Sequence, residues 1–197
     1  MLNTQINKTM KTISIEIPDG KKAEWKNGVL TLVDEKDNRP VTERIKTFSD
    51  AAYALGGIDH PFVRELNAAE EMELSADILA YLKLRVITAA LNEGWEPQFT
   101  TSEYRWFPWF VLYTQKEIDE LDAEDKARVV LRSGSGASAG GGVAFAGAGN
   151  DSSYAYAYFG SRLAFKTREL AEYAGKQFTD IWADFVFRPK QNPQAEK

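Results

Sequence analysis

The sequence of residues 133–160 is SGSGASAGGGVAFAGAGNDSSYAYAYFG, in which 23 of 28 residues are Gly, Ala, Ser or Tyr and Asp151 is the one charged residue. An apolar run, Val129-Val130-Leu131, precedes it, and residues 161–166 lead into a helical pattern. The segment therefore lies inside a domain and is neither a tail nor a linker. Small residues lose little side-chain entropy on ordering, and Tyr, Ser and Asn form adaptable contacts. We expect a recognition surface on a non-enzymatic binding protein.

The polar and aromatic members of this segment are the candidate ligand-binding residues. They are Ser133, Ser135, Ser138, Phe145, Asn150, Ser152, Ser153, Tyr154, Tyr156 and Tyr158. Strand alternation across residues 154–159 would place the three tyrosines on one face. Tyrosines separated by alanines suit a rigid amphipathic contact surface.

Composition limits the possible partners. The 197 residues are 44% hydrophobic, so a packed core is expected. The net charge of −5 and the lack of a basic run argue against nucleic acid or an anionic membrane as the main partner. The chain has no Cys, which removes disulfides and thiolate chemistry and fits synthesis in a reducing cytoplasm. Residues 1–9 do not resemble a signal peptide, no membrane span is expected, and no cofactor is predicted.

Local patterns predict an α+β protein in four parts. Residues 1–10 are expected to be a flexible extension, 11–40 a small β-hairpin element, 41–188 the main domain and 189–197 a flexible tail. The hairpin element is predicted from alternating Ile13, Ile15 and Ile17 and from Asn27-Gly28, which indicates a type I′ turn. Such a hairpin needs a partner, either the rest of the chain or a neighbouring subunit.

The main domain is predicted to have a helical middle and a C-terminal helix. Helices are expected at 48–55 and 75–93, a strand at 104–113 with Pro108 at an edge or bulge, an acidic helix from a Thr114/Glu117 capping box to about Lys126, and a last helix capped by Thr167. The aromatic residues of 104–113 suit either core packing or a sugar-stacking platform, and core packing is favoured.

Catalytic and metal motifs are weak. Residues 136–140 match a nucleophile elbow around Ser138, but no helix follows and the single histidine, His60, precedes the serine. Glycines 134, 136 and 140 are spaced one residue too far apart for a dinucleotide loop. With one histidine a histidine-rich metal site is excluded, and His60 is expected in a surface turn with no role. A pair of carboxylates for glycoside hydrolysis stays open, because geometry sets such pairs rather than spacing.

Several motifs resemble one group of proteins of bacterial phages and prophages. They are IPDGKKAEW at 17–25, LNEGW at 91–95, RWFPWF at 105–110, GSRLAFK at 160–166 and ELAEYAGKQF at 169–178. The resemblance covers nearly the whole chain and implies a phage setting without an assigned activity.

A second likeness is to C-type-lectin-like modules, including the variable proteins of diversity-generating retroelements. There a Tyr/Ser/Asn/Gly/Ala-rich segment precedes a Gly-x-Arg-Leu/Val strand, the place that residues 160–163 occupy here. This likeness implies an irregular antiparallel sheet with Gly/Ser/Tyr-rich loops and ligand contacts among residues 133–158. The helix after residue 166 departs from the lectin-like pattern.

These observations predict a phage-derived virion or surface protein that acts outside the cell after assembly in the bacterial cytoplasm. It would bind a host-surface glycan or protein as a homo-oligomer, because avidity makes weak loop contacts useful. Two alternatives remain: a structural virion decoration or assembly subunit whose glycine-rich segment packs against neighbouring subunits, and a carbohydrate-active hydrolase.

Overall fold

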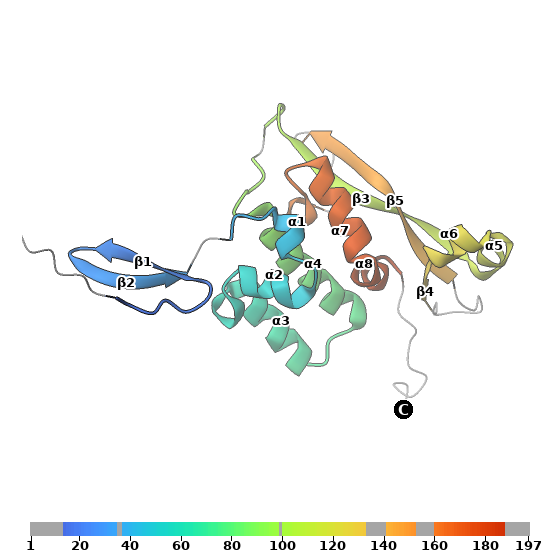
Figure 1. Cartoon of the computed structure of the whole chain (residues 1–197). Coiled ribbons are helices and arrows are strands. Elements are labelled where there is room, and N and C mark those ends of the chain that lie inside the picture. The colour runs from blue at the N-terminus through green and yellow to red at the C-terminus, as the bar shows by residue number, and fades with distance from the viewer. Residues whose placement is uncertain (1–13, 35–36, 99, 133–140, 153–159, 188–197) are drawn as a thin grey trace, which may run out of the picture. The chain divides into compact units, whose positions relative to one another are not determined.

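The computed structural model describes residues 14–34, 37–98, 100–132, 141–152 and 160–187 (Figure 1). The chain divides into two compact units, Met1–Arg39 and Pro40–Lys197. It combines an N-terminal β-hairpin, a helical middle, antiparallel sheets and C-terminal helices, so the predicted α+β class is confirmed.

The first unit holds an antiparallel hairpin of β1 (Lys21–Lys26) and β2 (Val29–Asp34). Asn27 and Gly28, which join the strands, have φ values of 50° and 79°. Positive φ at both central residues is what a type I′ turn requires, so the predicted turn is confirmed.

One face of this hairpin is apolar. Trp25 pairs with Leu30 and Ala23 with Leu32, which places the four side chains on the same side. Trp25 is 73% exposed and Leu32 is 45% exposed. Two strands alone cannot enclose these side chains, so the hairpin by itself has no core.

The strand predicted through Ile15 and Ile17 is wrong for the described residues 14–18. These residues have no regular secondary structure, and both isoleucines are exposed. Alternation predicts a strand only where a neighbouring strand takes up the backbone hydrogen bonds, and β1 and β2 pair only with each other in the described part of the unit.

The second unit runs from helices into a sheet and back to helices. Its elements are α1 (Val41–Arg44), α2 (Phe48–Ala54), η1 (Gly57–Asp59), α3 (Pro61–Glu71), α4 (Ala76–Asn92), β3 (Tyr104–Thr114), α5 (Gln115–Glu120), α6 (Ala123–Ala127), β4 (Val130–Arg132), β5 (Gly141–Ser152), η2 (Ser161–Leu163), α7 (Arg168–Gln177) and α8 (Thr179–Val186).

The predicted long helix, α4, lies at the centre of the core. Leu84, Val86 and Leu91 on α4 are fully buried, and α2, α3 and α8 pack around it. Trp182 of α8 is also fully buried, and its ring centroid lies 5.5 Å from that of Phe110 on β3. The core therefore joins the helices to the sheet.

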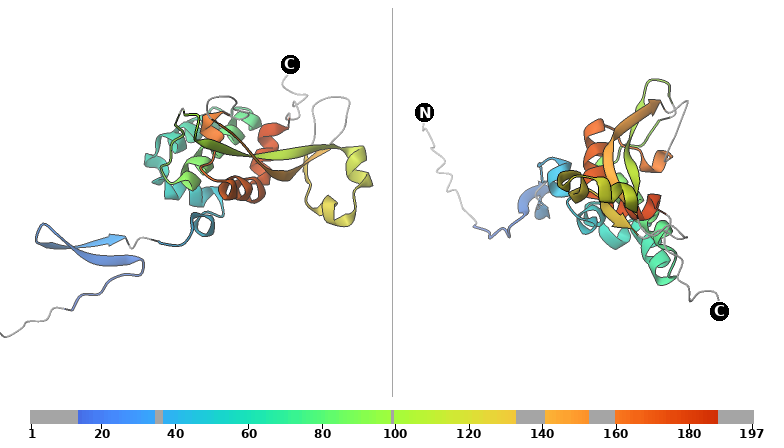
Figure 2. Two further views of the ribbon diagram at one scale, coloured as in Figure 1. Left: turned by 90° about the horizontal axis from the view of Figure 1, so that it is seen from above. Right: turned by 90° about the vertical axis from the view of Figure 1, so that its right-hand side faces the viewer.

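The sheet has the order β3-β5-β4, and all its pairs are antiparallel. Strands β3 and β5 form a long ribbon that extends past the other helices and carries α5 and α6 at its far end (Figure 1, Figure 2). Pro108 lies on the edge strand β3, and the register shifts between Trp109 and Phe110. The predicted edge position and irregularity are therefore confirmed. Residues 141–152 of the glycine-rich segment form the central strand of the sheet.

Two glycines of β5 lie beneath aromatic rings of β3. Trp109 pairs with Gly147, and Phe107 pairs with Gly149. A methyl group on Gly147 would lie 2.8 Å from Nε1 of Trp109, and one on Gly149 would lie 3.2 Å from the ring of Phe107. Each ring fills the space that a side chain would need, so glycine has a packing reason at both positions.

Two helices that were predicted as continuous are interrupted. The acidic helix ends at Glu120, and α6 begins after Asp122, whose carboxylate accepts from the backbone N–H of Asp125. The last helix breaks at Phe178, next to Thr179, whose hydroxyl donates to the carbonyls of Gly175 and Lys176. These local hydrogen bonds compete with the regular helical pattern.

Helix α7 approaches the sheet closely at Gly175. A methyl group there would lie 2.5 Å from Cε2 of Phe145 and 2.8 Å from Cβ of Pro108. The absence of a side chain on Gly175 therefore sets the distance between helix and sheet.

We predict that Gly175→Ala lowers the free energy of unfolding by up to about 2 kcal/mol. Overpacking costs about 1–3 kcal/mol, and the higher helix propensity of Ala offsets about 1 kcal/mol of it. In a Phe145→Ala background the cost should fall by about 1 kcal/mol, because the ring is gone. Urea unfolding of the four proteins of this double-mutant cycle measures the coupling. Strict additivity would contradict the close approach.

Candidate functional site

Three of the ten predicted ligand-binding residues lie on a described strand. Phe145, Asn150 and Ser152 belong to β5. The other seven lie outside the described residues: Ser133, Ser135, Ser138, Ser153, Tyr154, Tyr156 and Tyr158.

Phe145 faces the helices. The ring of Phe145 lies edge-on to that of Phe110, with the centroids 6.1 Å apart. The Phe145 ring also occupies the space where a side chain on Gly175 would lie. It also lines a cavity of about 450 Å³ with Arg128, Lys176 and Thr179, and Nζ of Lys176 lies 5.3 Å from its centroid. Phe145 is thus chiefly a packing residue, whereas Asn150 is exposed.

The aromatic residues of β3 divide between the two expected roles. Trp106 and Phe110 pack against the core. Tyr104 is 59% exposed and Trp109 is 47% exposed. Core packing and an exposed aromatic surface therefore occur on the same strand. The exposed ring of Trp109 packs against the backbone of its cross-strand partner, Gly147.

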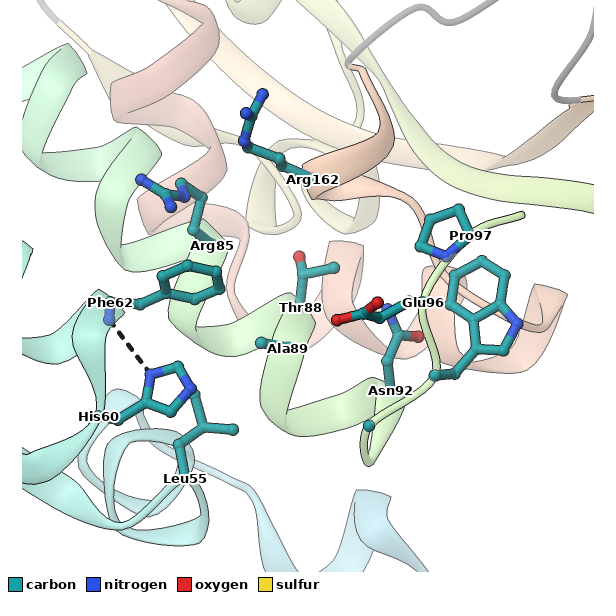
Figure 3. Close-up of a pocket in the computed structure, with 12 residues that line it drawn as sticks. Leu55, His60, Phe62, Arg85, Thr88, Ala89, Asn92, Glu96, Pro97 and Arg162 are labelled. Carbon is teal, nitrogen blue, oxygen red and sulfur yellow. Dashed lines mark hydrogen bonds between the residues drawn. The ribbon is translucent and has the colours of Figure 1, made fainter. Parts of the chain in front are cut away.

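A larger pocket of about 640 Å³ lies beside α4 (Figure 3). Its walls come from the end of α2, the start of α3, the C-terminal half of α4, the loop after α4, and η2. The lining residues are Leu55, His60, Phe62, Arg85, Thr88, Ala89, Asn92, Gly94, Trp95, Glu96, Pro97 and Arg162. Its volume is in the range typical of small-molecule sites.

Arg85 lies at one side of the pocket and is held in place by two neighbours. Its guanidinium carbon lies 4.3 Å from the ring centroid of Phe62, and Nη1 donates to Oε2 of Glu65 at 2.8 Å. The buried Nε has no hydrogen-bond partner among the described residues. One donor of a fixed guanidinium is therefore left unused.

Thr88 lies one turn further along α4, on the same face as Arg85. It is 2% exposed, and its hydroxyl finds no hydrogen-bond partner within the described parts of the chain. A helical threonine hydroxyl can bond the carbonyl three or four residues earlier, but no such bond is present here among the described residues. An unsatisfied buried hydroxyl costs about 1–3 kcal/mol, so a hydrogen-bond partner for this group would be stabilising.

Asn92 closes the bottom of the pocket and has a structural role. Its Nδ2 donates to the carbonyl of Ala164 at 2.9 Å, and its Oδ1 accepts from the backbone N–H of Lys166 at 3.1 Å. Asn92 is 4% exposed. It fixes the segment after η2 against the end of α4 and thereby positions Arg162.

His60 has a structural role that the sequence analysis did not assign. It is the N-cap of α3, and its Nδ1 accepts from the backbone N–H of Phe62 at 3.2 Å. Its place in a turn was predicted, whereas the capping of α3 by its side chain was not. The His60-Pro61 pair, with Pro at the first helical position, is the sequence feature that could have indicated this.

Two charged residues of the lining lack a partner. Within the described ranges, neither the Arg162 guanidinium nor the Glu96 carboxylate forms an ion pair. The pocket thus presents one unpaired cation and one unpaired anion above a buried hydroxyl. Glu96 is the one carboxylate of the lining, so this pocket does not supply the acid pair that a glycosidase needs.

The residues of this pocket come from five separate segments, so no local sequence pattern predicts it. Arg85, Thr88 and Asn92 form a polar stripe on an otherwise apolar helix, and such a stripe is compatible with contact to solvent as well as with a cavity. The stripe on an otherwise buried helix was the available signal.

Other classes of site find no support in the described structure. Among the described residues there is no group of three or more His, Asp or Glu side chains arranged to hold a metal ion. No described helix has the length and apolarity needed to cross a membrane. Comparison with protein-family models, curated proteins and solved structures gives no significant match.

We predict that Asn92→Ala lowers the free energy of unfolding by about 2–3 kcal/mol, because the Ala164 carbonyl and the Lys166 N–H lose their partner in a buried site. Chemical denaturation followed by tryptophan fluorescence measures the change. Asn150→Ala, at an exposed position on β5, is the matched control and should change stability by no more than about 0.5 kcal/mol. An equally small effect at Asn92 would show that the two hydrogen bonds do not hold the segment.

Proposed function

We propose that this chain is a non-enzymatic binding protein of phage or prophage origin that recognises a host-surface ligand, a glycan or a protein. The ribbon of β3 and β5, together with the segments at the ends of β5, would supply the contact surface. The observation that carries the proposal is Trp109, a 47% exposed indole on an edge strand with Gly147 beneath it.

An exposed ring supported in this way is suited to recognition. The close packing of the Trp109 ring over Gly147 restricts its rotation, so little side-chain entropy is lost on binding. Tryptophan supplies a large apolar face and one N–H donor, and it is enriched among residues that dominate binding energy.

The phage setting rests on the motif resemblance, and the oligomeric state is part of the proposal. The apolar face of the hairpin, with Trp25 73% exposed, supports association with another subunit. Several copies on a virion or cell surface would raise the avidity of weak individual contacts.

A second function, a structural virion or assembly subunit, is favoured by a different observation. Gly147 and Gly149 have a packing reason within the sheet itself, so the glycine content of β5 does not require an external ligand. In that case the Trp109 face and the hairpin would contact neighbouring subunits. The hydrolase alternative is favoured by no observation in the described structure.

We predict that Trp109→Ala weakens binding to host cells and to a printed glycan array at least tenfold, because the stacking face is lost. Trp109→Phe keeps a ring over Gly147 and should retain part of the affinity. Tyr53→Ala is the control, because Tyr53 is 85% exposed on α2, away from the ribbon. Circular dichroism confirms that each variant is folded.

Unchanged binding by folded Trp109→Ala would overturn the assignment of this surface. Sedimentation of the same variants separates the two functions. If the wild-type protein binds neither cells nor glycans but forms an oligomer that Trp109→Ala dissociates, the assembly function is supported instead.

A further inference from the structure

We propose that the pocket beside α4 binds a small zwitterion of the α-amino acid class with an apolar side chain. The Arg85, Thr88 and Arg162 groups would receive its carboxylate, and Glu96 would receive its ammonium group (Figure 3). This inference goes beyond the function proposed above, because it uses no residue of the exposed ribbon.

Unused hydrogen-bond donors of Arg85 indicate where the carboxylate of the ligand would bind. Glu65 occupies Nη1 of Arg85, and the buried Nε is left without a partner among the described residues. The stacking of the guanidinium on Phe62 fixes its orientation. A fixed guanidinium edge suits a carboxylate, because its planar donors match two carboxylate oxygens.

The hydroxyl of Thr88 is an independent observation that points to a ligand. It is almost fully buried in the pocket wall and lacks a partner in the described structure. A carboxylate oxygen that accepts from this hydroxyl would remove the cost of leaving it unpaired. Hydrogen bonds to charged groups are also stronger than those between neutral groups.

The charges of the lining favour a zwitterion over a simple anion. The pocket presents Arg162 and Glu96, which pair neither with each other nor with another described residue. With the Arg85–Glu65 pair included, the formal charges sum to zero. A dianionic phosphate would leave this site strongly negative, whereas a ligand with one carboxylate and one ammonium group pairs both free charges.

The remaining wall is apolar and indicates the type of side chain. Leu55, Phe62, Trp95 and Pro97 line the pocket with hydrocarbon surface. A volume of about 640 Å³ accommodates an amino acid as large as phenylalanine. An apolar or aromatic side chain would bury its surface there.

Calorimetry on the full chain with four probes tests the inference. The probes are L-phenylalanine, hydrocinnamate, which lacks the amine, phenethylamine, which lacks the carboxylate, and inorganic phosphate. We expect phenylalanine to bind at least tenfold more tightly than either single-charge analogue, and phosphate not to bind detectably.

Three variants assign the roles. Arg162→Gln should weaken the binding of phenylalanine about tenfold and leave the affinity for phenethylamine unchanged. Glu96→Gln should also weaken the binding of phenylalanine about tenfold, and it should leave the affinity for hydrocinnamate unchanged. Thr88→Val should weaken the binding of phenylalanine and of hydrocinnamate five- to tenfold. The midpoint of thermal unfolding should stay equal or rise, since the substitution removes a buried unpaired hydroxyl. Arg168→Gln, at an exposed arginine on α7, is the matched control and should bind like the wild type.

The outcomes are distinct from those of the cell-binding experiment, because Trp109→Ala should leave phenylalanine binding unchanged. Equal affinity for phenylalanine and both analogues would overturn the zwitterion assignment. Tighter binding of phosphate would overturn it as well, and so would the absence of binding by all four probes at millimolar concentration.

Discussion

The side-chain amide of Asn92 is the interaction on which the arrangement of the second unit depends. It bonds the carbonyl of Ala164 and the N–H of Lys166, so that the end of α4 is joined to the segment that leads into α7. Phe165, between these two residues, exchanges both backbone hydrogen bonds with Trp106 of β3. One buried amide therefore fixes the helical core, the edge of the sheet and the start of the last helices relative to one another.

A second constraint is the absence of side chains where the sheet meets its neighbours. Gly175 lets α7 approach Phe145 and Pro108, and Gly147 accepts the ring of Trp109. On one face of the sheet, the absence of a side chain on Gly175 allows α7 to pack closely. On the other face, the same absence on Gly147 allows an aromatic ring to lie over the backbone and remain half exposed. The same property therefore serves both stability and the proposed recognition surface.

The two proposed binding surfaces differ in how they are preorganised. The ribbon surface depends on a ring supported by the strand beneath it, and its ligand would meet an open face. The pocket depends on α4, whose buried apolar residues hold Arg85 and Thr88 in fixed positions. Donors that stay fixed and unpaired before binding lose little freedom when a ligand arrives, which favours selectivity even for a small molecule.

The sequence by itself determined the elements whose causes are local. Asn27-Gly28 specified its turn, Thr114 and Glu117 their capping box, Pro108 an edge or bulge position, and residues 75–93 a long helix. These features depend on backbone preference and side-chain periodicity within a few residues. The candidate site was predicted only in part: Phe145 was found on the sheet, but facing the helices.

Only the tertiary structure decided which polar groups lack partners and which segments meet. Thr88 and Arg162 are 74 positions apart, and no local pattern indicates that they line one pocket. Asn92 likewise bonds Ala164 and Lys166, more than 70 positions away along the chain. Long-range packing sets burial, and burial decides whether a hydroxyl or a guanidinium is satisfied by water or left to bind a ligand.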